Sequence, residues 1–230
     1  MKLLIRNLSK SYGKQVVLQN ANISFEQGKI YSILGRNGAG KTTLFNCING
    51  DLKYESGSIL RSDGVKENPL DFCDVGMVSA SPTLPEYLTG YEFIHFFIKL
   101  HGRGERSVED WLELVRMEQK DYFKLIKTYS YGMKNKLQLL CCLIRNPKVI
   151  LLDEPLSSFD ILVSHDIKEL LISMKNEHII LMSTHILQLA KDVSDNIVLL
   201  HHGKLSEMSS EDLYDDKFEA SIIAALKEGY

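Results

Sequence analysis

The sequence contains no apolar run long enough to cross a membrane. A transmembrane helix needs about 20 consecutive apolar residues, and charged residues interrupt every hydrophobic stretch here well before that length. The segment Met1–Arg6 places charges on both sides of a short strand pattern, which is not the arrangement of a secretory signal peptide. We therefore expect a cytoplasmic protein, and any membrane-spanning part of its machinery must come from other chains.

An excess of positive charge is also missing. The formal net charge is -3 at pH 7 and the isoelectric point is about 6.2, so the chain has no basic field to hold a polyanion. This argues against nucleic acid as a partner. The composition is otherwise that of a globular protein, with 25% charged and 44% hydrophobic residues.

Cysteines with the spacing of metal ligands are absent as well. The chain has four cysteines, and their separations match no zinc-binding pattern. Cys141 and Cys142 are adjacent within an apolar, helix-like run, so we expect them to fill core. This cysteine usage suits a reducing compartment.

What the sequence does contain is a complete phosphate-binding loop, G-R-N-G-A-G-K-T, between an apolar strand pattern at Ile30–Leu34 and the start of a helix. Its glycines let backbone N–H groups point inward at an anion, and the helix N-terminus adds partial positive charge. Lys41 is expected to reach the β- and γ-phosphates, and the Thr42 hydroxyl to ligate Mg²⁺. The residues expected to bind the nucleotide are Gly35, Asn37, Gly38, Ala39, Gly40, Lys41, Thr42 and Thr43.

A second motif places two carboxylates directly after an apolar strand. The strand pattern Val149–Leu152 is followed by Asp153 and Glu154, at the end of a strand where open α/β sheets bind ligands. Asp153 is placed to hold the Mg²⁺ shell, and Glu154 to act as base for an attacking water. Together with Lys41, these residues predict nucleotide hydrolysis.

Helices and strands alternate along much of the chain, which predicts an α/β fold with a mostly parallel sheet. Short strands are expected before the loop at residues 3–5, 16–18 and 21–25. Beyond the loop, helices are expected at 133–144 and 163–174, and strands at 149–152, 179–182 and 196–200. Thr89 and Glu92 have the spacing of a capping box that opens a helix.

The segment Tyr129–Lys134 (Y-S-Y-G-M-K) lies between the two nucleotide motifs. Here the chain resembles the ATP-binding cassette (ABC) family, whose signature is Leu-Ser-Gly-Gly-Gln. Ser130 and Gly132 match that signature, whereas the residues around them depart from it in a way that resembles exporter ATPases. Ser130 can also cap the following helix, whose N-terminus would point at a phosphate.

The resemblance implies roles for further residues. Tyr12 matches the aromatic residue that stacks on adenine, and His185 matches the switch histidine that contacts the γ-phosphate. The segment Ser157–Asp160 matches a loop through which two such domains touch. Family function implies a composite site, in which the Lys41, Glu154 and His185 side of one domain faces the Ser130 and Gly132 side of a second domain across ATP. The pair can be a homodimer or a heterodimer.

The resemblance covers nearly the whole chain and implies a single domain with three parts. A P-loop NTPase core with an antiparallel β region is expected at residues 1–83 and 129–210. A helical subdomain is expected at 84–128, and a C-terminal helical tail at 211–230. The implied cofactors are ATP and Mg²⁺.

One position breaks the family pattern. Family members usually carry glutamine or glutamate where this chain has Ala80, and an alanine side chain can neither ligate Mg²⁺ nor hydrogen-bond water. Our hypothesis is that Mg²⁺ coupling at this loop is weakened. We also expect Tyr87 and Tyr91 to be exposed near the groove in which family members dock the membrane subunit.

The function expected from the resemblance is that of an exporter ATPase subunit. It would lie on the inner face of the cell membrane, bound to a transmembrane permease, with peptides or antibiotics as cargo. One alternative is a non-transport ATPase that regulates or scaffolds another complex. A second is a degenerate nucleotide-binding partner in a heterodimer, against which the presence of Glu154 and His185 argues.

Overall fold

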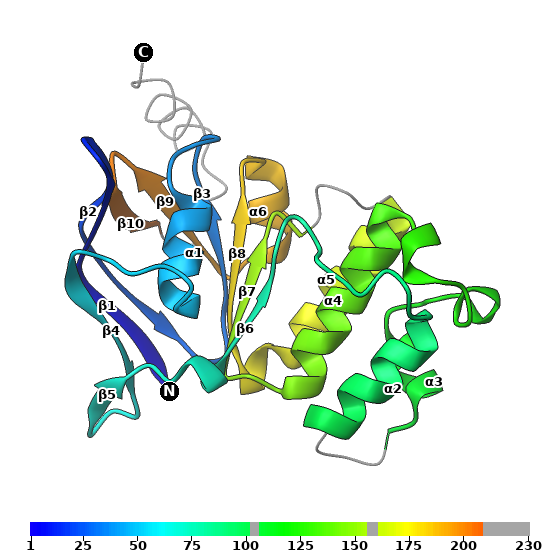
Figure 1. Cartoon of the computed structure of the whole chain (residues 1–230). Helices are drawn as coiled ribbons and strands as arrows, with labels where there is room; N and C mark the ends of the chain where they lie inside the picture. The colour runs from blue at the N-terminus through cyan, green and yellow to red at the C-terminus, as the bar shows by residue number, and fades with distance from the viewer. Residues whose placement is uncertain (102–105, 156–160, 209–230) are drawn as a thin grey trace.

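The computed structural model describes residues 1–101, 106–155 and 161–208 and contains two sheets (Figure 1). The smaller sheet is antiparallel, in the order β2-β1-β4-β5. Its strands are β1 (Lys2–Tyr12), β2 (Gln15–Glu26), β4 (Ser56–Ser62) and β5 (Glu67–Pro69). The strands expected at 16–18 and 21–25 are one continuous strand, because Asn20 adopts φ 47° at an irregularity in the pairing and does not end the strand.

The larger sheet has the order β10-β9-β3-β8-β7-β6. All of its pairs are parallel except that of β10 with β9, so the predicted mostly parallel sheet is confirmed. Its strands are β3 (Ile30–Leu34), β6 (Val75–Val78), β7 (Val149–Asp153), β8 (Ile179–Thr184), β9 (Asn196–His201) and β10 (Lys204–Met208). Every residue of β3, β7 and β8 is buried, as is usual for central parallel strands.

The α-helices are α1 (Lys41–Asn49), α2 (Gly90–His101), α3 (Val108–Leu114), α4 (Tyr131–Arg145), α5 (Ile161–Met174) and α6 (Leu187–Val193). Short 3₁₀ turns lie at Phe72–Asp74, Gln119–Asp121, Ile126–Thr128 and Lys175–Glu177. Helix α4 begins two residues before the predicted start, because Ser130 caps it and its Oγ accepts a hydrogen bond from the Met133 N–H at 3.2 Å.

Helices α1 and α4 pack on opposite faces of the larger sheet. Alternate residues of a strand point to opposite faces. On β7, Val149 and Leu151 share a core cluster with Phe45 of α1. Ile150 and Leu152 belong instead to the cluster that contains Leu137, Leu139 and Leu140 of α4. Helix α1 also lies between the two sheets, as Figure 1 shows.

The segment between β6 and α4 carries α2 and α3 and packs against α4. The capping box is confirmed, since the Thr89 N–H donates to Glu92 Oε2 at 2.9 Å and the Glu92 N–H donates to Thr89 Oγ1 at 3.1 Å. Tyr129 is buried, and its hydroxyl donates to the Asp121 carbonyl at 2.6 Å. An aromatic residue at this position therefore ties the start of α4 to the helical segment.

Cys142 is buried and Cys141 is half-buried, both on α4. Burial raises the pKa of each thiol to about 12, so both remain protonated and unreactive at neutral pH. The expectation that they fill core is confirmed. Across the described ranges, no helix has both the length and the apolarity that a membrane span requires. The expected tail at 211–230 lies outside those ranges.

Candidate nucleotide-binding site

The phosphate-binding loop occupies the predicted place between β3 and α1. Gly38 and Gly40 adopt φ 82° and 106°, which L-residues with a side chain rarely adopt. A Cβ on Gly40 would lie 2.6 Å from Val17 Cγ1, so β2 also leaves no space for a side chain there. The glycine pattern of the loop is therefore required by its backbone and by its packing.

Lys41 is held at the mouth of this loop. Its ammonium donates to the Gly35 carbonyl at 2.8 Å and to the Arg36 carbonyl at 3.3 Å. Its Nζ also lies 3.5 Å from Glu154 Oε1. The side chain is only 7% exposed, so a positive charge is fixed in a largely desolvated position, where it interacts strongly with an anion.

Thr42 and Asp153, the two predicted metal ligands, are in direct contact. Thr42 Oγ1 donates to Asp153 Oδ2 at 2.8 Å, and Ser183 Oγ donates to Asp153 Oδ1 at 2.5 Å. A hydroxyl beside a carboxylate offers the hard oxygen atoms that Mg²⁺ prefers, so these residues fit the ion. Among the described residues, no group of three or more His, Cys, Asp or Glu side chains could hold a metal.

Glu154 follows β7 in the left-handed region, with φ 51°. Its N–H donates to Ser183 Oγ at 2.9 Å, and both of its carboxylate oxygens lie 3.1 Å from His185 Nδ1. The hydroxyl of Ser183 thus joins Asp153 to Glu154. Ser183 could not be singled out from the sequence, because its role depends on β7 and β8 being neighbours in the sheet.

The strained backbone at Glu154 predicts a difference between two substitutions. Glycine adopts positive φ without steric cost, whereas alanine does not. We expect Glu154→Gly to be more stable than Glu154→Ala by about 1 kcal/mol, measured by thermal unfolding without nucleotide. Both variants lose the carboxylate, so the difference between their stabilities reports the cost of the positive φ at residue 154. Equal melting temperatures would contradict it.

Tyr12 lies at the end of β1, and 51% of its surface is exposed. It lines a cavity of about 460 Å³ together with Lys41, Thr42, Asp153 and Glu154. The other lining residues are Gln15, Val17, Asn37, Gly38, Gly40 and Thr43. The cavity volume is in the usual range for a small-ligand site, and an exposed ring at its edge is available for stacking.

Ser130 and Gly132 do not line this cavity. Ser130 is exposed at the start of α4, which packs on the opposite face of the sheet from α1. The structure thus brings most of the predicted site residues together around the Lys41 cavity. The signature residues Ser130 and Gly132 lie outside it. The segment Ser157–Asp160 lies outside the described residues.

Ala80 is half-buried in the segment that follows β6. Its neighbour Ser79 is hydrogen-bonded to the side chain of Gln138 on α4. With the amide oriented to satisfy both residues, Gln138 donates to the Ser79 carbonyl at 3.1 Å and accepts from the Ser79 N–H at 3.2 Å. Gln138 therefore fixes the point at which the chain leaves the sheet for the helical segment.

The Mg²⁺ hypothesis for Ala80 has a direct test. We expect Ala80→Gln to lower the Mg²⁺ concentration at half-maximal ATP hydrolysis by about tenfold, because under this hypothesis the amide would supply the oxygen that family members carry at this position. Ala80→Met is the matched control, since it has similar length and no amide. An unchanged Mg²⁺ dependence in Ala80→Gln would remove the hypothesis.

Of the two tyrosines expected to be exposed, only one is. Tyr87 is 81% exposed, as predicted. The prediction for Tyr91 was wrong, since its ring is half-buried and stacks on Phe123 at 5.0 Å between ring centroids. Phe123 is 69% exposed, so the helical segment presents a different aromatic ring from the one expected.

Comparison with known proteins gives consistent matches. Residues 18–157 match the family model described as ABC transporter. The lantibiotic transport ATP-binding protein SrtF of Streptococcus pyogenes is 33% identical over 88% of this chain and 88% of its own length. The bacitracin transport ATP-binding protein BcrA of Enterococcus faecalis is 34% identical over 87% of this chain and 67% of its own.

Solved structures agree with these matches. The ATP-binding subunit of an ABC transporter superposes with a TM-score of 0.84 at 26% identity, over 97% of this chain and 100% of that one. A dimeric ATP-binding cassette in a post-hydrolysis state, bound to ADP and phosphate, superposes with a TM-score of 0.78. It is 24% identical over 90% of this chain and 98% of its own, and supports the likeness in fold alone.

Proposed function

The chain belongs to the ABC transporter family, and from this premise we propose that it is the ATPase subunit of an exporter, which works in pairs and drives a separate transmembrane subunit. The resemblance and the P-loop α/β fold inferred from the sequence are thereby confirmed. As a member of this family, the chain binds ATP and hydrolyses it. Association with a membrane permease follows from its relation to transport ATP-binding proteins.

One observation carries the proposal: five of the predicted site residues lie together at one edge of the larger sheet. They are Lys41, Thr42, Asp153, Glu154 and His185. Lys41 and the loop N–H groups would bind the phosphates of ATP. Thr42 and Asp153 would hold Mg²⁺, which neutralises phosphate charge when bound. Glu154 would take the proton of the attacking water, and His185 would keep its carboxylate oriented.

The placement of α4 supports a site completed by a second domain. The Ser130 hydroxyl and the α4 N-terminus are suited to a phosphate, yet Ser130 lies outside the Lys41 cavity of its own chain. We propose that Ser130 and Gly132 face the ATP held by the other domain of the pair. A single copy would then hydrolyse ATP poorly.

We also propose the division into a core at 1–83 and 129–210 and a helical subdomain at 84–128. The supporting observation is that α2 and α3 follow the segment fixed by Gln138 and end before the Ser130 cap. The exposed Tyr87 and Phe123 of this subdomain are our candidates for contact with the permease, on the cytoplasmic face of the membrane.

The names of the relatives suggest the cargo. SrtF and BcrA are named as lantibiotic and bacitracin transport proteins, and we propose a peptide antibiotic or similar compound as the exported substrate. In this proposal the membrane subunit selects the cargo.

Co-purification separates transport from the alternative of a regulatory or scaffolding ATPase. We expect a tagged chain, solubilised from its native membrane, to carry a polytopic membrane protein with it. The variant Tyr87→Ala/Phe123→Ala should lose this partner and keep the ATPase activity of the purified chain. Recovery with a non-membrane complex alone would contradict the transport proposal.

A further inference from the structure

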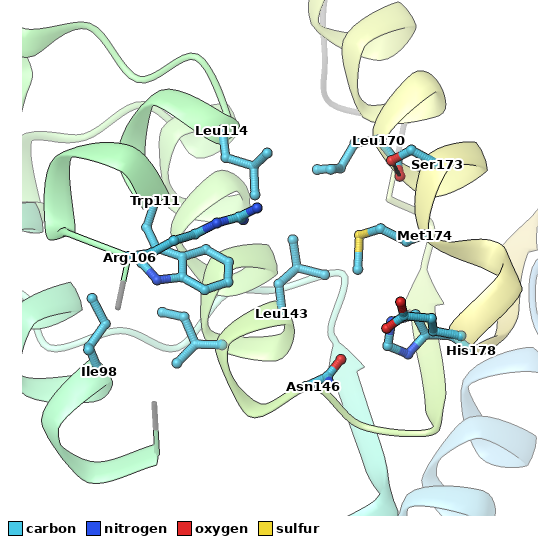
Figure 2. Close-up of a pocket in the computed structure, with 12 residues that line it drawn as sticks. Ile98, Arg106, Trp111, Leu114, Leu143, Asn146, Leu170, Ser173, Met174 and His178 are labelled. Atoms are coloured by element: carbon cyan, nitrogen blue, oxygen red, sulfur yellow. Dashed lines mark hydrogen bonds between the residues drawn. The ribbon is translucent and has the colours of Figure 1, made fainter. Parts of the chain in front are cut away.

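A second cavity, of about 450 Å³, lies between the helical segment and α5 (Figure 2). It is next to Asn146 at the C-terminal end of α4 and to His178 just before β8. It therefore lies towards the opposite edge of the parallel sheet from the Lys41 site. Its apolar wall is formed by Ile98, Trp111, Leu114, Leu143, Leu170 and Met174.

One end of this cavity is polar and rich in hydrogen-bond acceptors. His178 is only 3% exposed, and its Nδ1 lies 2.6 Å from the Pro147 carbonyl. A carbonyl can only accept, so Nδ1 carries the hydrogen of this contact, and in the tautomer whose single hydrogen is on Nδ1 the Nε2 atom is an acceptor. Across the described part of the chain, Nε2 has no hydrogen-bond partner.

Two further acceptors line the cavity. Glu177 contributes a carboxylate. The Ser173 hydroxyl donates to the Leu170 carbonyl at 2.7 Å, which leaves its lone pairs available. Figure 2 shows Asn146 and His178 at one end of the cavity and Trp111 across from them. Arg106, the one lysine or arginine among the described lining residues, lies over the Trp111 ring at 5.1 Å, across the cavity from His178 (Figure 2).

We propose that this cavity binds a small amphipathic amine, at a site separate from the nucleotide site. The apolar body would pack against Trp111, Leu143 and Met174, and the ammonium group would donate to Glu177 and His178. An apolar pocket of this volume with a few convergent polar groups is the usual form of a small-molecule site. At the end formed by Glu177 and His178, the carboxylate and the Nε2 acceptor favour a cationic donor over a carboxylate, while Arg106 lies beside Trp111.

The single tryptophan makes the test direct, because Trp111 lines the cavity and is the only source of tryptophan emission. The probe is 4-phenylbutylamine, compared with 4-phenylbutanol and 4-phenylbutyrate, which share its apolar body. We expect a saturable change in emission with the amine and an affinity for the carboxylate weaker by about tenfold or more. A similar response to all three compounds would overturn the choice of an amine.

Variants locate the binding. Leu170→Phe should fill the cavity and abolish the response, and Glu177→Gln should weaken binding of the amine by about tenfold. Glu113→Gln, at an exposed position that does not line the cavity, is the matched control. In Trp111→Phe the amine should still raise the melting temperature. The absence of a saturable signal up to millimolar amine, or full binding by Leu170→Phe, would overturn the proposal.

Discussion

Replacing Glu154 with glutamine is expected to lower kcat for ATP hydrolysis by about 10²- to 10⁴-fold, the usual contribution of a general base. Glutamine keeps the size of the side chain but cannot take a proton from water. ATP binding should remain, because Lys41 keeps its contacts with the Gly35 and Arg36 carbonyls. Steady-state hydrolysis and equilibrium binding of ATP measure the two effects separately.

Glu207→Gln is the matched control for this variant. Glu207 lies on β10 and accepts a hydrogen bond from the Asn196 side chain, with no contact to the Lys41 cavity. Its kcat should equal that of the unaltered protein. If Glu154→Gln also retained full turnover, Glu154 would not be the base, and the degenerate-partner alternative would gain support.

Replacing Lys41 with alanine is expected to weaken ATP binding by about 10²- to 10³-fold and to remove measurable hydrolysis. Lys41 is the buried cation of the loop, and no other lysine or arginine among the described residues lines the cavity. Isothermal titration with ATP and steady-state hydrolysis both report this loss.

The control for Lys41→Ala is Lys175→Ala, which also breaks a lysine–carboxylate pair. Lys175 bonds to Asp195 at 2.6 Å just before β8, at the opposite edge of the sheet from the phosphate-binding loop. The Lys175→Ala variant should leave the affinity for ATP unchanged. Comparable losses in the two variants would mean that Lys41 acts through general stability and not through phosphate binding.

The sequence predicted those parts of the site that depend on local patterns. The glycine spacing before Lys41 and the apolar run before Asp153 each combine a strand end with a polar motif, and the order of strands brought the two together. The Ser130 cap and the box at Thr89 were equally local and were confirmed. Such features need only a few neighbouring residues to be recognised.

Features that depend on pairing between distant segments could not be predicted. Ser183 bonds to Asp153 only because β7 and β8 are adjacent, and Gln138 reaches Ser79 only because α4 packs against β6. Tyr91 was misjudged for the same reason, since Phe123 covers it from 32 positions further along the chain. In each case tertiary packing brings the two residues together, and no periodic pattern in the sequence marks them as partners.

A mixing experiment tests the central claim that two domains share each site. Lys41→Ala removes the phosphate-binding side of the site, and Ser130→Arg is expected to block the signature side. Each variant alone should be inactive, because both sites of its dimer are damaged. In a mixed dimer, one site combines an intact Lys41 with an intact Ser130.

Hydrolysis by the equimolar mixture is therefore the decisive measurement. A shared site predicts recovery to about a quarter of the unaltered activity, because half of the dimers are mixed and each has one of two sites intact. Differently tagged variants must first be shown to capture each other. If mixed dimers form and activity stays at the level of the separate variants, each chain carries its whole site alone and the account is wrong.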